Sequence, residues 1–78
     1  MTEEQKEKLE EQFNYYSYLA ELHKSNLEDD DCSELYHRNI KVKWALYEAL
    51  KVLGYTFVYA CTKEHMGIEY WTYKLVKA

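Results

Sequence analysis

Apolar residues recur every three or four positions in the first third of the chain. They follow one another at spacings of four, three, four and seven, which places them on one side of a helix. These positions are Leu9, Phe13, Tyr16, Ala20 and Leu27. Thr2 and Gln5 have the spacing of a capping box, so the helix is expected to begin there and to run to about residue 26.

The opposite side of this helix is polar and is expected to face water. It consists of Glu3, Lys6, Glu10, Asn14, Ser17, Glu21 and Lys24. A second apolar patch, made by Tyr15, Tyr18, Leu19 and Leu22, widens the apolar arc in the C-terminal half. A surface helix needs an apolar stripe of only about 100°, so this half is expected to be either central in the fold or buried against another chain.

A second helix is expected to follow the acidic run at residues 28–31. Aspartates favour caps and turns, which makes Asp31 the expected N-cap and Ser33 the alternative. Gly54 suits the left-handed position just past the C-terminus of a helix. The expected core stripe is Leu35, Val42, Leu46, Ala49, Leu50 and Leu53.

The pattern after Gly54 changes to that of a β-hairpin. Residues 55–62 are rich in aromatic and β-branched residues, residues 63–67 suit a five-residue turn, and residues 68–76 form the second strand. The face with Trp71, Tyr73 and Leu75 is expected to be the core face. The sequence therefore predicts one α+β domain over residues 1–78, with two amphipathic helices followed by a C-terminal antiparallel β-hairpin.

Neither face of this hairpin is purely polar, and a two-stranded hairpin is marginal on its own. One face is expected to lie on the helices. The unpaired strand edges are expected to pair with a second copy, which would give a homodimer with a four-stranded sheet across a two-fold axis.

Charge is divided unevenly along the chain. Residues 1–34 hold eleven acidic residues against three lysines, and the remainder holds seven basic residues against three acidic ones. An acidic surface of this kind suits a basic partner.

No run of about 18 apolar residues exists, which argues against a membrane protein. Two cysteines and no apolar leader indicate a cytoplasmic protein, although a disulfide between Cys32 and Cys61 stays open.

Residues with metal-binding or nucleophilic chemistry are few and widely spaced. They are His23, His37, His65, Cys32 and Cys61, with no Cys-x-x-Cys or His-x-x-x-His spacing. Both glycines have turn roles, which leaves no phosphate-binding loop. We therefore expect no metal, no cofactor and no enzymatic activity.

Eleven tyrosines and tryptophans favour a protein-binding or regulatory module, because these residues are enriched at interfaces. One form of it is an acidic inhibitor of a basic, nucleic-acid-handling protein. The expected partner-binding residues are Tyr15, Tyr18, Leu22, Asp29, Asp30, Asp31 and Trp44. The alternative is a minimal winged-helix-like nucleic-acid-binding protein. Its contacts would come from helix 2 and the hairpin tip through Arg38, Lys41, Lys51, Lys63 and His65.

Overall fold

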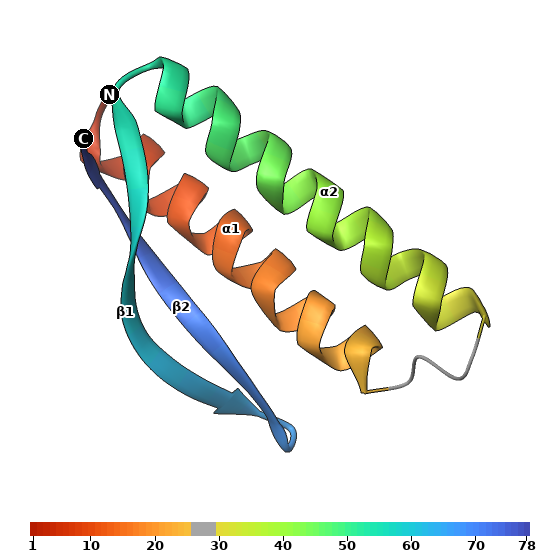
Figure 1. Cartoon of the computed structure of the whole chain (residues 1–78). Helices are drawn as coiled ribbons and strands as arrows, with labels where there is room; N and C mark the ends of the chain where they lie inside the picture. Colours follow the sequence, from red (N-terminus) through yellow and green to blue (C-terminus); the bar gives the residue numbers. More distant parts are fainter. Residues whose placement is uncertain (26–29) are drawn as a thin grey trace.

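The first helix lies at the centre of the fold, with the second helix on one flank and the hairpin on the other (Figure 1). The computed structural model describes residues 1–25 and 30–78. Helices α1 (Glu3–Lys24) and α2 (Asp30–Val52) precede strands β1 (Tyr55–His65) and β2 (Ile68–Lys77), which pair antiparallel. This confirms the predicted fold class of two helices followed by a hairpin.

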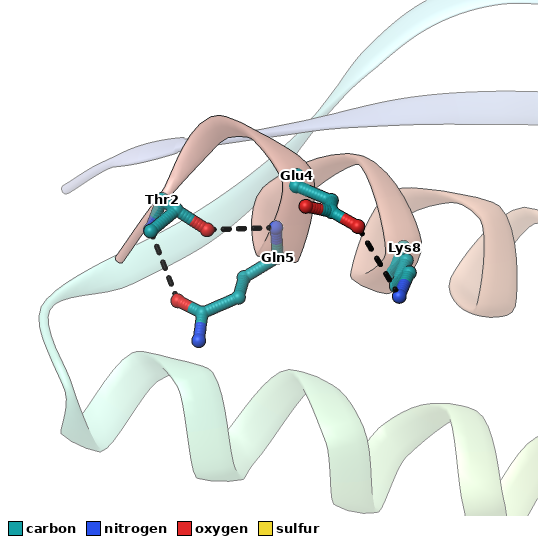
Figure 2. Close-up of polar contacts among 4 residues, drawn as sticks. All are labelled: Thr2, Glu4, Gln5 and Lys8. Carbon is teal, nitrogen blue, oxygen red and sulfur yellow. Dashed lines mark hydrogen bonds and ion pairs between the residues drawn. The ribbon is translucent and has the colours of Figure 1, made fainter.

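Helix α1 begins with the predicted capping box (Figure 2). The Gln5 backbone N–H donates to the Thr2 hydroxyl at 3.1 Å, and the Thr2 backbone N–H donates to Gln5 Oε1 at 3.0 Å. These bonds satisfy two backbone N–H groups that have no partner inside the helix. The same view shows the exposed ion pair of Lys8 with Glu4, one helical turn apart.

The two ends of α2 differ in how well the sequence predicted them. The helix begins at Asp30, so Asp31 and Ser33 already lie inside it and both expected N-caps are wrong. The C-terminus follows the prediction, because Gly54 adopts a φ of 88° and its N–H donates to the carbonyl of Lys51. Only glycine adopts this left-handed conformation without strain, so Gly54 ends the helix and starts the turn into β1.

The core is small and largely aromatic. The Phe13 and Phe57 rings are stacked with centroids 3.8 Å apart, and the Tyr73 ring meets Phe13 edge-on at 5.2 Å. Leu50 and the fully buried Leu75 close this cluster. Of the expected α1 stripe, Phe13 and Ala20 are buried and Leu9 and Tyr16 are half-buried, while Leu27 lies outside the described residues.

The sequence predicted that the polar side of α1 faces water. Part of this side contacts β2 instead. Asn14 donates through Nδ2 to the Tyr73 carbonyl at 3.2 Å and accepts from the Tyr73 N–H at 2.8 Å. Glu10 accepts from the Leu75 N–H at 2.9 Å. These backbone groups point away from β1, where a third strand would otherwise pair with them. The polar side of α1 therefore covers the outer edge of β2, and Ser17 on the same side is buried.

The buried side of α2 is rotated relative to the expected stripe. Leu50 is buried and Leu46 packs against the core, but Leu35, Val42, Ala49 and Leu53 are exposed. The inner side instead carries Tyr36, Asn39, Ile40, Lys43 and Tyr47, which are buried or half-buried. A lysine is tolerated there because its long aliphatic stem packs against apolar groups and its ammonium lies over the Phe13 and Tyr73 rings.

The hairpin is longer and tighter at its tip than expected. Both strands extend to a two-residue turn at Met66 and Gly67, whose φ angles are 51° and 82°, so the five-residue turn is wrong. Positive φ at both positions matches the right-handed twist of the strands. A bulge between Tyr59 and Cys61 breaks the register.

The inner face of β2 also changes along its length. Near the tip the half-buried or buried residues are Ile68, Tyr70 and Thr72, whereas near the base they include Tyr73 and Leu75. Trp71 is mostly exposed, so the expected continuous core face of Trp71, Tyr73 and Leu75 is wrong. The bulge on β1 increases the local twist and turns the two halves of the hairpin relative to the helix.

Replacing Asn14 tests whether α1 seals the edge of β2. Asn14→Ala leaves two Tyr73 backbone groups without partners, so we expect the free energy of unfolding to fall by about 1–3 kcal/mol. Urea unfolding followed by circular dichroism measures this change. Gln12→Ala, at an exposed position of the same helix, is the control and is expected to change it by less than about 0.5 kcal/mol. Equal effects of the two substitutions would contradict the edge contact.

Replacing Met66 tests the turn geometry. Asparagine adopts a positive φ more readily than methionine, so Met66→Asn is expected to raise the thermal midpoint and stabilise the fold by up to about 1 kcal/mol. Met66→Val places a β-branched residue at the same angle and is expected to lower the midpoint. A turn of another type would reverse or abolish this order.

Candidate functional site: an aromatic groove

A groove lies over α1, between α2 and the hairpin. It consists of two hollows, of about 340 and 230 Å³, that share Ile40, Lys43 and Tyr73. We call it the aromatic groove. Its lining residues are Phe13, Ser17, Ala20 and Glu21 of α1, Tyr36, Ile40, Lys43, Trp44 and Tyr47 of α2, and Phe57, Thr62, Glu69, Tyr70, Trp71 and Tyr73 of the hairpin.

Ring contacts connect the hairpin wall of the groove to the core. The Trp71 ring lies 5.3 Å from Tyr59, and Tyr59 lies 6.5 Å from Tyr73, which packs on Phe13. On the opposite wall Trp44 meets Tyr47 edge-on at 5.6 Å. Trp44 is 57% exposed and Trp71 is 59% exposed. The aromatic groove therefore presents large, stiff side chains to solvent on both walls.

Lys43 is the cation where the two hollows meet. Its Nζ lies 5.1 Å from the centroid of the Phe13 ring and 5.0 Å from that of Tyr73, within the range of a cation–π contact. Burial lowers the pKa of Lys43 below its usual value of 10.5, and the negative charge of Glu21 opposes part of that shift. Burial, with the charges of Glu21 and Tyr59, raises the pKa of Tyr73.

The polar groups of the larger hollow differ in their surroundings. Ser17 is buried, and its Oγ has no hydrogen-bond partner among the described residues. Glu21 and Glu69 are exposed, and neither forms an ion pair within the part of the chain that the structure describes. No described residue therefore acts as a base on the Ser17 hydroxyl, and the groove offers rings, charges and this buried hydroxyl for binding.

A second, more open hollow lies where α1 meets the outer side of the hairpin tip. We call it the tyrosine depression; its volume is about 380 Å³. It is lined by Glu11, Asn14, Tyr15, Tyr18, Lys63, His65, Tyr70 and Thr72. The Tyr18 ring meets His65 and Tyr70 edge-on, each at 5.3 Å, which fixes the hairpin tip against α1.

The expected partner-binding residues fall on two different surfaces. Trp44 lines the aromatic groove, whereas Tyr15 and Tyr18 line the tyrosine depression, and Leu22 is half-buried on α1. Tyr15 is 58% exposed, and Tyr18 is half-buried by its ring contacts. Asp29 lies outside the described residues, as do the side chains of Asp30 and Asp31.

The residues expected for nucleic-acid binding are also separated. Arg38 and Lys41 line a shallow hollow on α2, with the exposed Glu34 3.8 Å from Arg38. Lys63 and His65 belong to the tyrosine depression. Lys51 lies in the last turn of α2, at the opposite end of the molecule from the hairpin tip (Figure 1). The structure does not gather these five side chains into one basic surface.

The groove includes Tyr36, Lys43 and Trp71, none of which the sequence assigned to partner binding. Tyr36 and Lys43 share a helical face with Ile40 and Tyr47, so the spacing alone could have placed them together. The sequence pattern does place Tyr36, Ile40 and Tyr47 together, as an apolar arc beside the leucine stripe, but it leaves out the charged Lys43. The exposure of Trp71 follows from the twist of the hairpin, for which the sequence carries no clear signal.

Cys61 has a free, exposed thiol whose sulfur lies 3.2 Å from the Thr72 hydroxyl oxygen. The side chain of Cys32 lies outside the described residues. Among the side chains that the structure describes, those of residues 1–25 and 33–78, no three from histidine, cysteine, aspartate or glutamate converge as metal ligands would. Neither described helix has both the length and the apolar character needed to cross a membrane.

No protein family model matches this sequence, and no curated protein or solved structure shows significant similarity to it.

Replacing Glu21 tests the electrostatics of the aromatic groove. The Glu21 charge raises the pKa of both Lys43 and Tyr73, so Glu21→Gln is expected to lower both values. NMR titration of ¹³C-labelled lysine and tyrosine measures them. In the unsubstituted protein the Lys43 midpoint is expected below 10.5 and the Tyr73 midpoint above 10.0.

The lowered pKa of Lys43 determines how its contribution to folding stability changes with pH. Between the lowered pKa of Lys43 and 10.5, the unfolded chain binds more protons than the folded chain, so this group's contribution to stability rises with pH there. Glu7→Gln, near the start of α1, is the control and is expected to leave both midpoints in place. A Lys43 midpoint at or above 10.5 would contradict the burial of its ammonium.

Proposed function

We propose that this chain is a non-enzymatic protein-binding module and that its aromatic groove holds an apolar segment of a partner protein. The observation that carries the proposal is the exposure of Trp44 and Trp71 on opposite walls of one groove. Tryptophan is among the residues that contribute most to binding where interfaces have been dissected. A monomer gains little from leaving two such side chains more than half exposed.

The size and lining of the groove support a segment rather than a flat surface as its partner. The smaller hollow, of about 230 Å³, has walls made by Phe13, Trp44, Tyr47 and Phe57, which suit one large apolar side chain. Burial of such a side chain contributes about 1.5–3 kcal/mol. Contacts with the two exposed tryptophans would add to this and exclude water around it.

Regulation of a basic, nucleic-acid-handling protein stays within this proposal. The acidic half of the chain supports a basic partner, because opposite charge speeds and orients association. A cytoplasmic location is proposed with it, and the free thiol of Cys61 is compatible with a reducing compartment.

A second copy of the chain is the other candidate partner. The expected dimer would extend the hairpin into a four-stranded sheet, and one specific contact restricts how it forms. Because α1 side chains occupy the outer edge of β2 at Tyr73 and Leu75, the second copy would have to pair along β1. The backbone edge that includes the exposed Val58 and Tyr59 would then be covered.

Two matched substitutions test the proposed partner surface. Trp44 and Tyr15 are aromatic, lie on helices and are almost equally exposed, at 57% and 58%, but only Trp44 lines the aromatic groove. The tagged protein and its Trp44→Glu and Tyr15→Glu variants are used to capture proteins from the native cell, with quantitative mass spectrometry as the measurement. Trp44→Glu is expected to reduce capture of the partner at least about tenfold.

Tyr15→Glu is expected to leave that capture within about twofold, since a single exposed substitution outside the contact has little effect. Circular dichroism of both variants controls for folding. Loss of capture with Tyr15→Glu alone would assign binding to the tyrosine depression. Capture that does not depend on Trp44 would overturn the groove as the binding surface.

A further inference from the structure

We propose that the larger hollow of the aromatic groove receives an arginine side chain of the partner protein. This inference rests on the proposed function and adds the chemistry that the partner segment must carry. It comes from three features that converge in one place: rings on two walls, unpaired carboxylates at the rim and a buried hydroxyl without a partner.

The rings of the larger hollow suit a flat cation. Tyr36 stands on the α2 wall, and Tyr70, Trp71 and Tyr73 stand on the hairpin wall of a hollow of about 340 Å³. The faces of these rings carry partial negative charge and attract cations, and tryptophan attracts them most strongly. A guanidinium group is planar and stacks on such faces more readily than an ammonium does.

Neither carboxylate of the hollow forms a close ion pair with a described residue, although the charge of Glu21 acts on Lys43. Glu21 of α1 and Glu69 of β2 line it from different elements, and neither has an ion-pair partner among the described residues. Glu69 is also paired across the hairpin with Glu64. Directly opposed residues share one face of a hairpin, and two like charges in this position repel each other. A cation bound beside Glu69 would relieve that repulsion.

The buried hydroxyl is the independent sign that the hollow is incomplete. Ser17 is 4% exposed, lines the larger hollow, and its Oγ has no hydrogen-bond partner in the described part of the chain. Buried hydroxyl groups are normally satisfied, so an unpaired one beside a hollow marks a place for a donor or acceptor from outside. A guanidinium offers five N–H donors.

Lys43 also lines this hollow and repels an incoming cation. Its ammonium is held over the Phe13 and Tyr73 rings, where the larger hollow joins the smaller one. One ammonium stands against two carboxylates, so the formal charge of the lining stays negative. We therefore place the guanidinium at the end of the groove with Glu69 and Trp71, away from Lys43.

The test compares two probes of nearly the same shape, one with a charged guanidinium and one with a neutral urea in its place. N-acetyl-arginine methylamide and its citrulline analogue have nearly the same shape, but only arginine carries a guanidinium. Each is titrated into ¹⁵N-labelled protein at low salt, and amide and indole signals are followed by NMR. The arginine probe is expected to shift the Trp71 indole signal and to bind at least about fivefold more tightly than citrulline.

Variants locate the site and separate it from diffuse attraction to the acidic chain. Glu21→Gln combined with Glu69→Gln is expected to abolish the preference for arginine, whereas Glu11→Gln, in the tyrosine depression, is expected to keep it. Both variants change exposed residues, so folding is not at risk. Equal binding of the two probes, or shifts that follow Glu11 instead, would overturn the arginine site.

The arginine titration and the capture experiment with Trp44→Glu can fail independently of each other. If capture depends on Trp44 but arginine is not preferred over citrulline, the groove binds a partner and only the chemistry inferred for the larger hollow is wrong. If arginine binds at Glu21 and Glu69 but capture does not depend on Trp44, the arginine site stands and the apolar contact fails.

Discussion

The arrangement of this protein depends on how the outer edge of β2 is satisfied. A two-stranded sheet leaves backbone groups on each outer edge without partners, and no third strand from residues 1–25 or 30–78 covers β2. Asn14 and Glu10 of α1 supply the missing bonds to Tyr73 and Leu75. Because these side chains are short, the helix must lie alongside the strand. Phe13 is thereby brought onto Phe57, and the aromatic core forms around that pair.

This placement also explains why a groove exists. With β2 on one flank of α1 and α2 on the other, one side of α1 faces the space between them, which neither neighbour fills. The side chains that reach into this space come from all of the elements. They include a stacked and partly exposed set of rings, together with Lys43 held over two of them. The aromatic groove is thus the part of this small core that no other described element covers.

The sequence predicted those features that depend on neighbouring residues, and it failed on those that depend on distant ones. The order of elements, the capping box at Thr2 and the helix end at Gly54 follow from local spacing and backbone preference. The roles of Asn14 and Lys43 do not, because hydrophobic periodicity assigns polar residues to water. An asparagine that serves a strand edge or a lysine whose stem packs on rings is visible only once its tertiary partner is known. The sequence predicted Trp44 as a contact residue, but it did not predict the groove that Trp44 lines.

Amide hydrogen exchange at Tyr73 and Leu75 tests whether α1 covers the outer edge of β2. Both N–H groups point away from β1, so only the side chains of α1 can protect them. Both amides are expected to exchange as slowly as amides bonded between the two strands, and Asn14→Ala is expected to remove protection from Tyr73 first. Exchange of both amides at the rate of an unprotected strand edge would contradict this arrangement. In that case α1 would not lie against β2, and the α1 residues would not line the aromatic groove.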